Sequence, residues 1–194
     1  EKIKQVVDVR KGEIMFGLNM IVHKGRTIFI GDTSVHEYPT SEQMAAMAIS
    51  TARVVRLFGF DPKVAFVSHS TFGQPLTSRT KHIKKAVDIL KDKNVDFEFD
   101  GDMQPDVALN SEYEELYPFA KIVGKANILI MPGQHSAAIS YKLMKTIGDA
   151  KVIGPLLIGL GLPVEIAPLR TSTSELINLA SIAAYSAEKI DYSK

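Results

Sequence analysis

The chain has 194 residues, of which 45% are hydrophobic and 23% charged, and its formal net charge is +1. This balance excludes a global electrostatic field that would recruit nucleic acid, and the lack of cysteine excludes disulfides, thiolate metal ligands and a cysteine nucleophile. No apolar run reaches the roughly 18 residues of a membrane-spanning helix. We therefore expect a globular, cytoplasmic protein with no membrane partner, built as one large domain or as one domain and part of another.

The first half of the chain alternates short apolar runs with amphipathic segments. Residues 14–22 and 27–31 flank a glycine-containing loop, a pattern typical of a β-hairpin. Thr40 and Gln43 have the spacing of a capping box, which predicts the start of a helix. Two further elements are expected: a buried strand at 63–68 and a helix at 79–91.

The second half continues the same alternation. Ser172 and Glu175 form a second capping box, which opens the last expected helix. Strands and helices that alternate at this spacing favour an α/β fold with a mainly parallel sheet and helices on both faces. The expected elements, in order, are a strand at 97–101, a partly helical segment at 106–119, a strand at 127–131, a helix at 137–147, a strand at 152–157 and a helix at 173–190.

Three polar loops follow expected strands, and ligands of open α/β sheets bind at the carboxyl ends of the strands. The loops span residues 68–78, 132–136 and 160–173. Hydroxyls and backbone amides in the first two could cradle an anion, although an ordinary solvated loop is the alternative. The anion-loop candidates are Ser68, Ser70, Thr71, His135 and Ser136.

The chain has no pattern typical of a metal site or a nucleotide-binding loop. None of the five histidines has metal-ligand spacing, so a structural or surface histidine is the better interpretation of each. Asp100, Asp102 and Asp106 lack the glutamate and the spacing of a calcium loop. We therefore interpret these three aspartates as solvated side chains. The Walker A, G-x-G-x-x-G and G-x-S-x-G motifs are also missing. We therefore expect no metal ligands in this chain.

Several runs of the chain resemble one protein family. They lie at residues 29–43, 63–73, 100–109, 126–132, 139–142 and 153–156, together with Gly159. From about Gly12 onward the chain is similar to the phosphate acetyl/butyryl transferase family. It is most similar to the transferase-like C-terminal region of hybrid NADP-dependent malic enzymes.

This resemblance implies a two-domain, isocitrate-dehydrogenase-like architecture in which one domain is inserted into the other and CoA lies in the cleft between them. The chain then corresponds to the second domain of a phosphotransacetylase-like unit. On that basis residues 3–155 are the inserted domain. Residues 156–194 are the returning segment of a first domain whose N-terminal part precedes this chain.

The same resemblance bears on catalysis, because active members of the family carry a Ser-Arg pair followed by an Asp. An ungapped match places Pro168 and Leu169 on that pair and Glu175 on the acid, so two of the three roles are empty. Arg170 is the fallback for the arginine, and Glu175 has the alternative role of a helix cap.

The resemblance also identifies residues of the expected acyl-CoA cleft. Thr146 stands where active members carry an arginine that supplies several fixed donors to an anion. Ile153 and Ile182 are the apolar candidates for contact with CoA. With Glu175 and Arg170, these residues make up the expected acyl-CoA-binding set.

The leading functional hypothesis is a regulatory domain of an NADP-dependent malic enzyme, which oxidatively decarboxylates malate to pyruvate. Acetyl-CoA would bind as an allosteric effector without acyl transfer. NADP and Mg²⁺ or Mn²⁺ would belong to the upstream malic-enzyme module, which would be a partner in the same chain. The alternatives are an active phosphate acetyl/butyryltransferase and an oligomerisation module, with a homodimer or a higher homo-oligomer expected.

Overall fold

The hairpin near the start of the chain forms the middle of a seven-stranded sheet in the computed structural model, which describes residues 2–189. Strands β1 (Phe16–His23) and β2 (Arg26–Gly31) pair in antiparallel register, with His23 opposite Arg26. The two residues between them, Lys24 and Gly25, both have positive φ. Such turns match the twist of the flanking strands. The predicted hairpin is confirmed.

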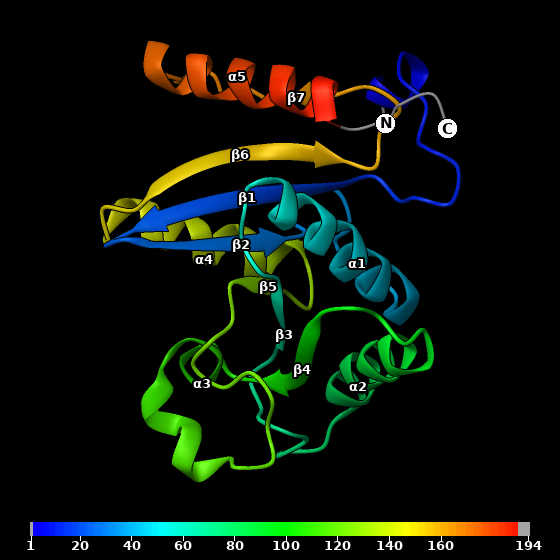
Figure 1. Ribbon diagram of the computed structural model, residues 1–194, viewed down its shortest axis with the longest axis vertical. Helices are drawn as coiled ribbons and strands as arrows, with labels where there is room; N and C mark the ends of the chain where they lie inside the picture. Colours follow the sequence, from blue (N-terminus) through cyan, green and yellow to red (C-terminus); the bar gives the residue numbers. More distant parts are fainter. Residues whose placement is uncertain (1, 190–194) are drawn as a thin grey trace.

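The sheet has the order β4-β3-β5-β2-β1-β6-β7 (Figure 1). Strands β2, β5, β3 and β4 pair in parallel, whereas β1, β6 and β7 join by antiparallel pairs. Five of the seven described strands therefore point in one direction, and only β1 and β7 oppose them. The remaining strands are β3 (Lys63–Val67), β4 (Glu98–Met103), β5 (Ile128–Ile130), β6 (Lys151–Ile158) and β7 (Val164–Glu165).

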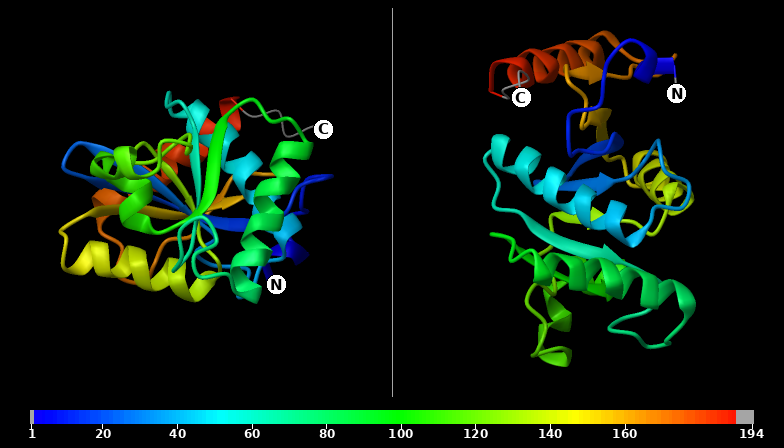
Figure 2. Two further views of the ribbon diagram at one scale, coloured as in Figure 1. Left: turned by 90° about the horizontal axis from the view of Figure 1, so that it is seen from below. Right: turned by 90° about the vertical axis from the view of Figure 1, so that its right-hand side faces the viewer.

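Helices cover both faces of the sheet, as the sequence predicts (Figure 2). Helices α1 (Ser41–Leu57) and α2 (Ser78–Asp92) pack on a core that contains Phe16, Phe29 and Phe66. Helices α3 (Pro105–Leu109) and α4 (Gln134–Thr146) cover the opposite face, around Ile21 and Ile30. The 3₁₀ turns η1 (Lys2–Gln5) and η2 (Ser111–Leu116) complete the described helical elements.

The capping boxes begin their helices as the sequence predicts, but the start of α4 and the strand β7 do not follow the prediction. The backbone N–H of Gln43 donates to Thr40 Oγ1 over 3.2 Å, and that of Thr40 donates to Gln43 Oε1 over 2.8 Å. Helix α4 starts three residues before the predicted position, at Gln134. Strand β7 was not expected, because a strand of two residues has no readable hydrophobic period.

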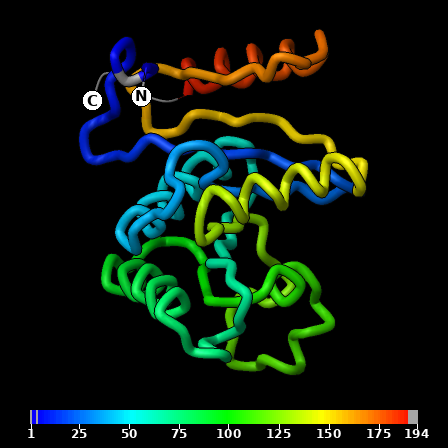
Figure 3. Tube along the Cα trace, turned by 180° about the vertical axis from the view of Figure 1, so that it is seen from behind, coloured from blue at the N-terminus to red at the C-terminus, as the bar shows by residue number. Residues whose placement is uncertain are grey.

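Helix α5 (Thr173–Lys189) lies along β6 and β7 at one end of the molecule (Figures 1 and 3). Its buried residue, Leu179, joins the core on the α1 side of the sheet. The predicted helix also included Ile190, which lies outside the described residues. No helix in the described part of the chain is both long and apolar enough to cross a membrane.

Candidate functional site

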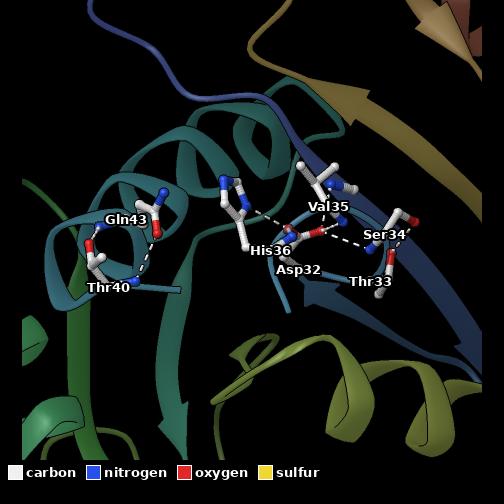
Figure 4. A network of polar contacts seen from close by, with 8 residues as sticks. Asp32, Thr33, Ser34, Val35, His36, Thr40 and Gln43 are labelled. Atoms are coloured by element: carbon white, nitrogen blue, oxygen red, sulfur yellow. Dashed lines mark hydrogen bonds and ion pairs between the residues drawn. The ribbon is translucent and has the colours of Figure 1, made fainter. Parts of the chain in front are cut away.

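A buried carboxylate organises the loop that follows β2 (Figure 4). Asp32 is only 1% exposed and accepts hydrogen bonds from the backbone N–H groups of Gly17, Ser34, Val35 and His36 at 2.7–3.2 Å. The Nδ1 atom of His36 lies 2.8 Å from Asp32 Oδ2. With its oxygens satisfied by the protein, Asp32 fixes the loop. This role of Asp32 was not predicted from the sequence, although an acidic residue beside Thr and Ser is typical of such turns.

The hydroxyls of the loop after β3 also have partners within the protein. Ser68, Ser70 and Thr71 are buried. The Ser70 hydroxyl donates to the carboxylate of Asp102 and lies 3.3 Å from the Ser68 hydroxyl. Thr71 Oγ1 accepts from the backbone N–H of Gln104 over 3.2 Å. An anion bound here would face the Asp102 carboxylate, so we leave these three residues out of the proposed ligand site.

The second candidate anion loop lies at the start of α4. His135 is exposed, and its Nε2 atom lies 3.4 Å from Glu37 Oε1. Ser136 donates its hydroxyl to the carbonyl of Gly133 over 2.7 Å. The first turn of α4 has no side-chain cap, but an anion there would meet the Glu37 carboxylate. These two residues do not join the pocket described next.

A pocket of about 80 Å³ between α4, β6 and the start of α5 unites several of the predicted residues. We call it the α4–α5 pocket. All of its lining residues lie between Tyr141 and Leu179, and β6 contributes residues 152–155. Its lining includes Tyr141, Lys145, Ile153, Gly154, Pro168, Arg170, Glu175 and Leu179.

Glu175 is held at the rim of this pocket by a capping box and an ion pair. The N–H of Ser172 donates to Glu175 Oε2 over 2.8 Å, and the N–H of Glu175 donates to Ser172 Oγ over 3.3 Å. Lys145 Nζ, from α4, lies 3.4 Å from Glu175 Oε1. The backbone and side-chain bonds of Ser172, and then Lys145, lower the pKa of Glu175 below its usual value. Glu175 therefore caps α5 as a carboxylate.

The turn before α5 separates two neighbouring side chains. Pro168 and Arg170 line the pocket, whereas Leu169 is fully exposed. The carbonyl of Pro168 accepts hydrogen bonds from the N–H and the hydroxyl of Thr171, which closes the turn. The turn therefore brings the guanidinium of Arg170 to the pocket. Arg170 is the residue that the sequence offered as a fallback for the family's arginine.

The predicted acyl-CoA residues fall into different places. Ile153 lines the α4–α5 pocket, but Ile182 lines a separate cavity farther along α5. Thr146 is exposed on α4 and is not part of the pocket lining. Tyr141 and Lys145 also line the pocket and were not predicted from the sequence. Their spacing of four residues on a predicted helix was the signal that they share one face.

Gly154, which lines the pocket on β6, has no room for a side chain. A Cβ at this position would lie 2.4 Å from Asn19 Oδ1 and 2.8 Å from the carbonyl oxygen of Leu18, and φ is +130°. A larger residue is therefore excluded by both contact and backbone conformation.

Within residues 2–189, no cluster of three or more His, Asp or Glu side chains could hold a metal ion.

Comparison with known protein families shows which family this chain belongs to. The model of the phosphate acetyl/butaryl transferase family matches residues 1–184. The chain belongs to this family. Its fold agrees with a phosphotransacetylase from Streptococcus pyogenes, with a TM-score of 0.90 and 28% identity over 96% of this chain and 58% of that one. The EutD phosphotransacetylase from Staphylococcus aureus has a TM-score of 0.88 and 27% identity, over 95% of this chain and 58% of that one.

Full-length relatives connect this family member to malic enzymes. An NADP-dependent malic enzyme from Rhizobium meliloti is 44% identical over 187 residues, which are 96% of this chain and 25% of that protein. A phosphate acetyltransferase from Clostridium acetobutylicum is 34% identical over 84% of this chain and 49% of that protein. The chain therefore spans about a quarter of the length of the malic enzymes it matches. The predicted resemblance is confirmed.

Proposed function

We propose that this chain is the regulatory, transferase-like domain of an NADP-dependent malic enzyme, and that it binds acetyl-CoA without transferring the acyl group. Acetyl-CoA would act as an allosteric effector by binding one state of the enzyme better than another. The observation that carries the proposal is that Pro168 lines the α4–α5 pocket, because the family resemblance would match this residue to the catalytic serine.

The groups around the pocket fit binding better than acyl transfer. Arg170 supplies positive charge for an anionic ligand, whereas the charge of Lys145 is shared with Glu175. Ile153 and Leu179 supply apolar contact. Pro168 has no hydroxyl and no N–H, so it can neither activate a thiol nor donate to an oxyanion. Glu175 is already engaged by Ser172 and Lys145. The pocket therefore keeps charged and apolar groups that can bind a ligand. The hydroxyl donor expected at the position of Pro168 is missing.

The size of the pocket implies that other parts of the parent protein complete it. Its volume of about 80 Å³ is below the roughly 300–1,000 Å³ typical of ligand pockets. We propose that residues 3–155 are the inserted domain, and that residues 156–194 return to a first domain whose remainder lies upstream. The upstream chain would then form the opposite wall of the acyl-CoA cleft.

Calorimetry on the full-length parent tests this proposal. Acetyl-CoA should bind, and malate oxidation should change in its presence. The same titration on a Lys145→Ala variant should show weaker binding. If acetyl-CoA neither binds nor changes malate oxidation, the proposed regulatory function is wrong.

An active phosphate acyltransferase is the second candidate, because Arg170 lines the pocket. A guanidinium in this position could bind phosphate through two parallel hydrogen bonds. Release of the CoA thiol from acetyl-CoA and phosphate, measured on the full-length parent, decides between the two candidates. Turnover that Arg170→Ala abolishes would favour the transferase.

The remaining partners follow from the malic-enzyme relationship. NADP and Mg²⁺ or Mn²⁺ would bind in the upstream malic-enzyme module. We also propose a homodimer or a higher oligomer, because Ile139, Leu143 and Ile147 form an exposed apolar stripe on and just after α4. Light scattering on the full-length parent with Leu143→Glu tests whether this stripe contributes to assembly.

A further inference from the structure

A crevice of about 270 Å³ lies where the parallel strands end, beside the start of α2. We call it the α2 crevice. Its walls are Tyr38 and Pro39 after β2, the first turns of α2, and Pro132 after β5. It shares no residue with the α4–α5 pocket. All of its walls belong to the proposed inserted domain, and α2 lies toward the other end of the molecule from α5 (Figures 1 and 2).

The connections of the sheet diverge at this crevice. Strands β3 and β5 are parallel neighbours. The chain leaves β3 for α2, which packs on the face of the sheet that carries Phe66, but it leaves β5 for α4, which packs on the face that carries Ile30. Such a switch point is where open α/β sheets bind ligands. The α2 crevice therefore lies at the place that the topology favours for a site.

His82 holds the walls of the crevice together. Its Nε2 atom lies 2.9 Å from the carbonyl oxygen of Pro39, and its Nδ1 atom lies 3.0 Å from Ser41 Oγ. The Ser41 hydroxyl in turn donates to the carbonyl of His82 over 2.8 Å. Pro39 and Ile83 are buried beside it. The crevice is therefore preformed and largely apolar, and the ring of His82 is already engaged by the protein.

Arg79 gives the crevice a positive charge that no acid balances. Its Cζ atom lies 5.8 Å from the centroid of the Tyr38 ring, and it forms no ion pair with an acidic side chain within residues 2–189. The two acids nearby in the sequence have other partners. Glu37 Oε1 lies 3.4 Å from His135 Nε2, Glu42 Oε1 lies 2.7 Å from Lys85 Nζ, and neither acid lines the crevice. An anion here would meet a cation and no lining carboxylate.

The start of α2 adds donors to this charge. A helix start favours acidic side chains, but the first turn of α2 has none, and the helix opens with Arg79 and Lys81. The capping box satisfies the N–H groups of Thr77 and Thr80. The N–H groups of Ser78 and Arg79 have no partner within the helix, and both residues line the crevice. A bound anion would compensate the positive charge of this turn.

We propose that the α2 crevice is a second binding site, whose ligand is a small phosphomonoester with an aromatic or apolar body. The phosphate lies on the guanidinium of Arg79, the hydroxyl of Ser78 and the unpaired N–H groups of the first turn. These donors suit the three oxygens of a phosphate better than the two of a carboxylate. The body of the ligand lies against the ring of Tyr38 and the apolar wall of Pro39 and Ile83.

Calorimetry with phenyl phosphate on the full-length parent tests the proposal. At about pH 7.5 and near-physiological salt the ligand is mostly a dianion, because the second pKa of a phosphomonoester is about 6. Inorganic phosphate probes the anion alone and phenol probes the ring alone. Each should bind about tenfold more weakly than phenyl phosphate. If inorganic phosphate binds equally well, the choice of ligand is wrong.

Two variants of α2 form a matched pair. Arg79→Gln removes the guanidinium from the crevice and should weaken binding of phenyl phosphate by about tenfold. Lys81→Gln removes a charge from the same turn, but Lys81 does not line the crevice, so the affinity should stay within about twofold of the wild type. Similar losses in both variants would reveal a general effect of charge on α2 and overturn the site.

Two further measurements fix the position of the ligand. Tyr38 is 66% exposed, so Tyr38→Ala spares the core; it should weaken binding of phenyl phosphate but not of inorganic phosphate. Acetyl-CoA should bind Arg79→Gln as it binds the wild type, because Arg79 is not part of the α4–α5 pocket. A loss of acetyl-CoA binding in this variant would overturn the separation of the two sites. If the wild-type parent does not bind phenyl phosphate, the α2 crevice is not a site, and the acyl-CoA proposal is unaffected.

Discussion

Lys145 and Glu175 join α4 to α5 across the rim of the α4–α5 pocket, with Nζ and Oε1 3.4 Å apart. Lys145 belongs to the proposed inserted domain and Glu175 to the proposed returning segment. The pair is therefore a direct electrostatic link across the proposed domain boundary. Because both side chains are solvent-accessible, the link is weak and sensitive to salt.

Removal of this link should raise the pKa of Glu175. In Lys145→Ala the pKa should move up toward its usual value, but only in part, because the hydrogen bonds from Ser172 are larger causes of its depression. NMR titration of the carboxyl carbon measures the change. Lys142→Ala, one turn earlier on α4, is the control, since Lys142 does not line the pocket. An unchanged pKa in Lys145→Ala would contradict the ion pair.

Two adjacent residues offer a matched test of the pocket. Arg170→Ala should weaken acetyl-CoA binding by about tenfold, the loss of one charge-assisted contact. Leu169→Ala should leave the affinity within about twofold, because Leu169 is exposed and outside the pocket lining. Calorimetry on the full-length parent compares the two. Similar losses in both variants would show that the turn, not the guanidinium, matters.

The cap of α5 should contribute to stability. Ser172→Ala removes the oxygen that accepts from the Glu175 N–H and should lower the free energy of unfolding by about 1 kcal/mol. Ser181→Ala, on the exposed face of the same helix, should change it by less than about 0.5 kcal/mol. Denaturant titration measures both. A Ser172→Ala variant as stable as the control would contradict the capping role.

The loop after β2 should depend on one carboxylate. Asp32→Asn replaces an acceptor oxygen with an NH₂ group that faces backbone donors, and should cost about 3 kcal/mol of stability. Asp96→Asn is the comparison at the surface, where a change of about 0.5 kcal/mol or less is expected. Thermal unfolding of the two variants gives the difference. Equal stability would mean that the loop does not need the charge.

Stability should fall as pH rises through the range set by Glu165. Burial raises the pKa of Glu165 to about 8, so the folded state holds this proton up to about pH 8, whereas an unfolded glutamate releases it near 4.5. The folded state therefore binds more protons between these values, so the free energy of unfolding declines across them and levels off above pH 8. Glu165→Gln should remove that decline and gain about 1–3 kcal/mol at high pH. Denaturant titrations at pH 5 and 8.5 provide the check.

The sequence predicted the fold well because its signals are local. Both capping boxes lie within four residues, and the buried strands are continuous apolar runs that need no distant partner to be recognised. Strand β7 escaped prediction because it exists only through its pairing with β6. The hydroxyls of residues 68–71 had the composition of an anion loop, but the composition could not reveal that Asp102 lies beside them.

By itself the sequence determined the alternation of strands and helices, the capped start of α5 and the presence of proline where the family match expects a serine. Only the tertiary structure decided that Lys145 meets Glu175 and that Arg170 lines the pocket while Leu169 faces solvent. It also decided that the Oε2 atom of Glu165 is buried with no hydrogen-bond partner among the described residues. The reason is physical. Helix and strand patterns depend on neighbours along the chain, whereas charge pairing, exposure and desolvation depend on which distant segments packing brings together.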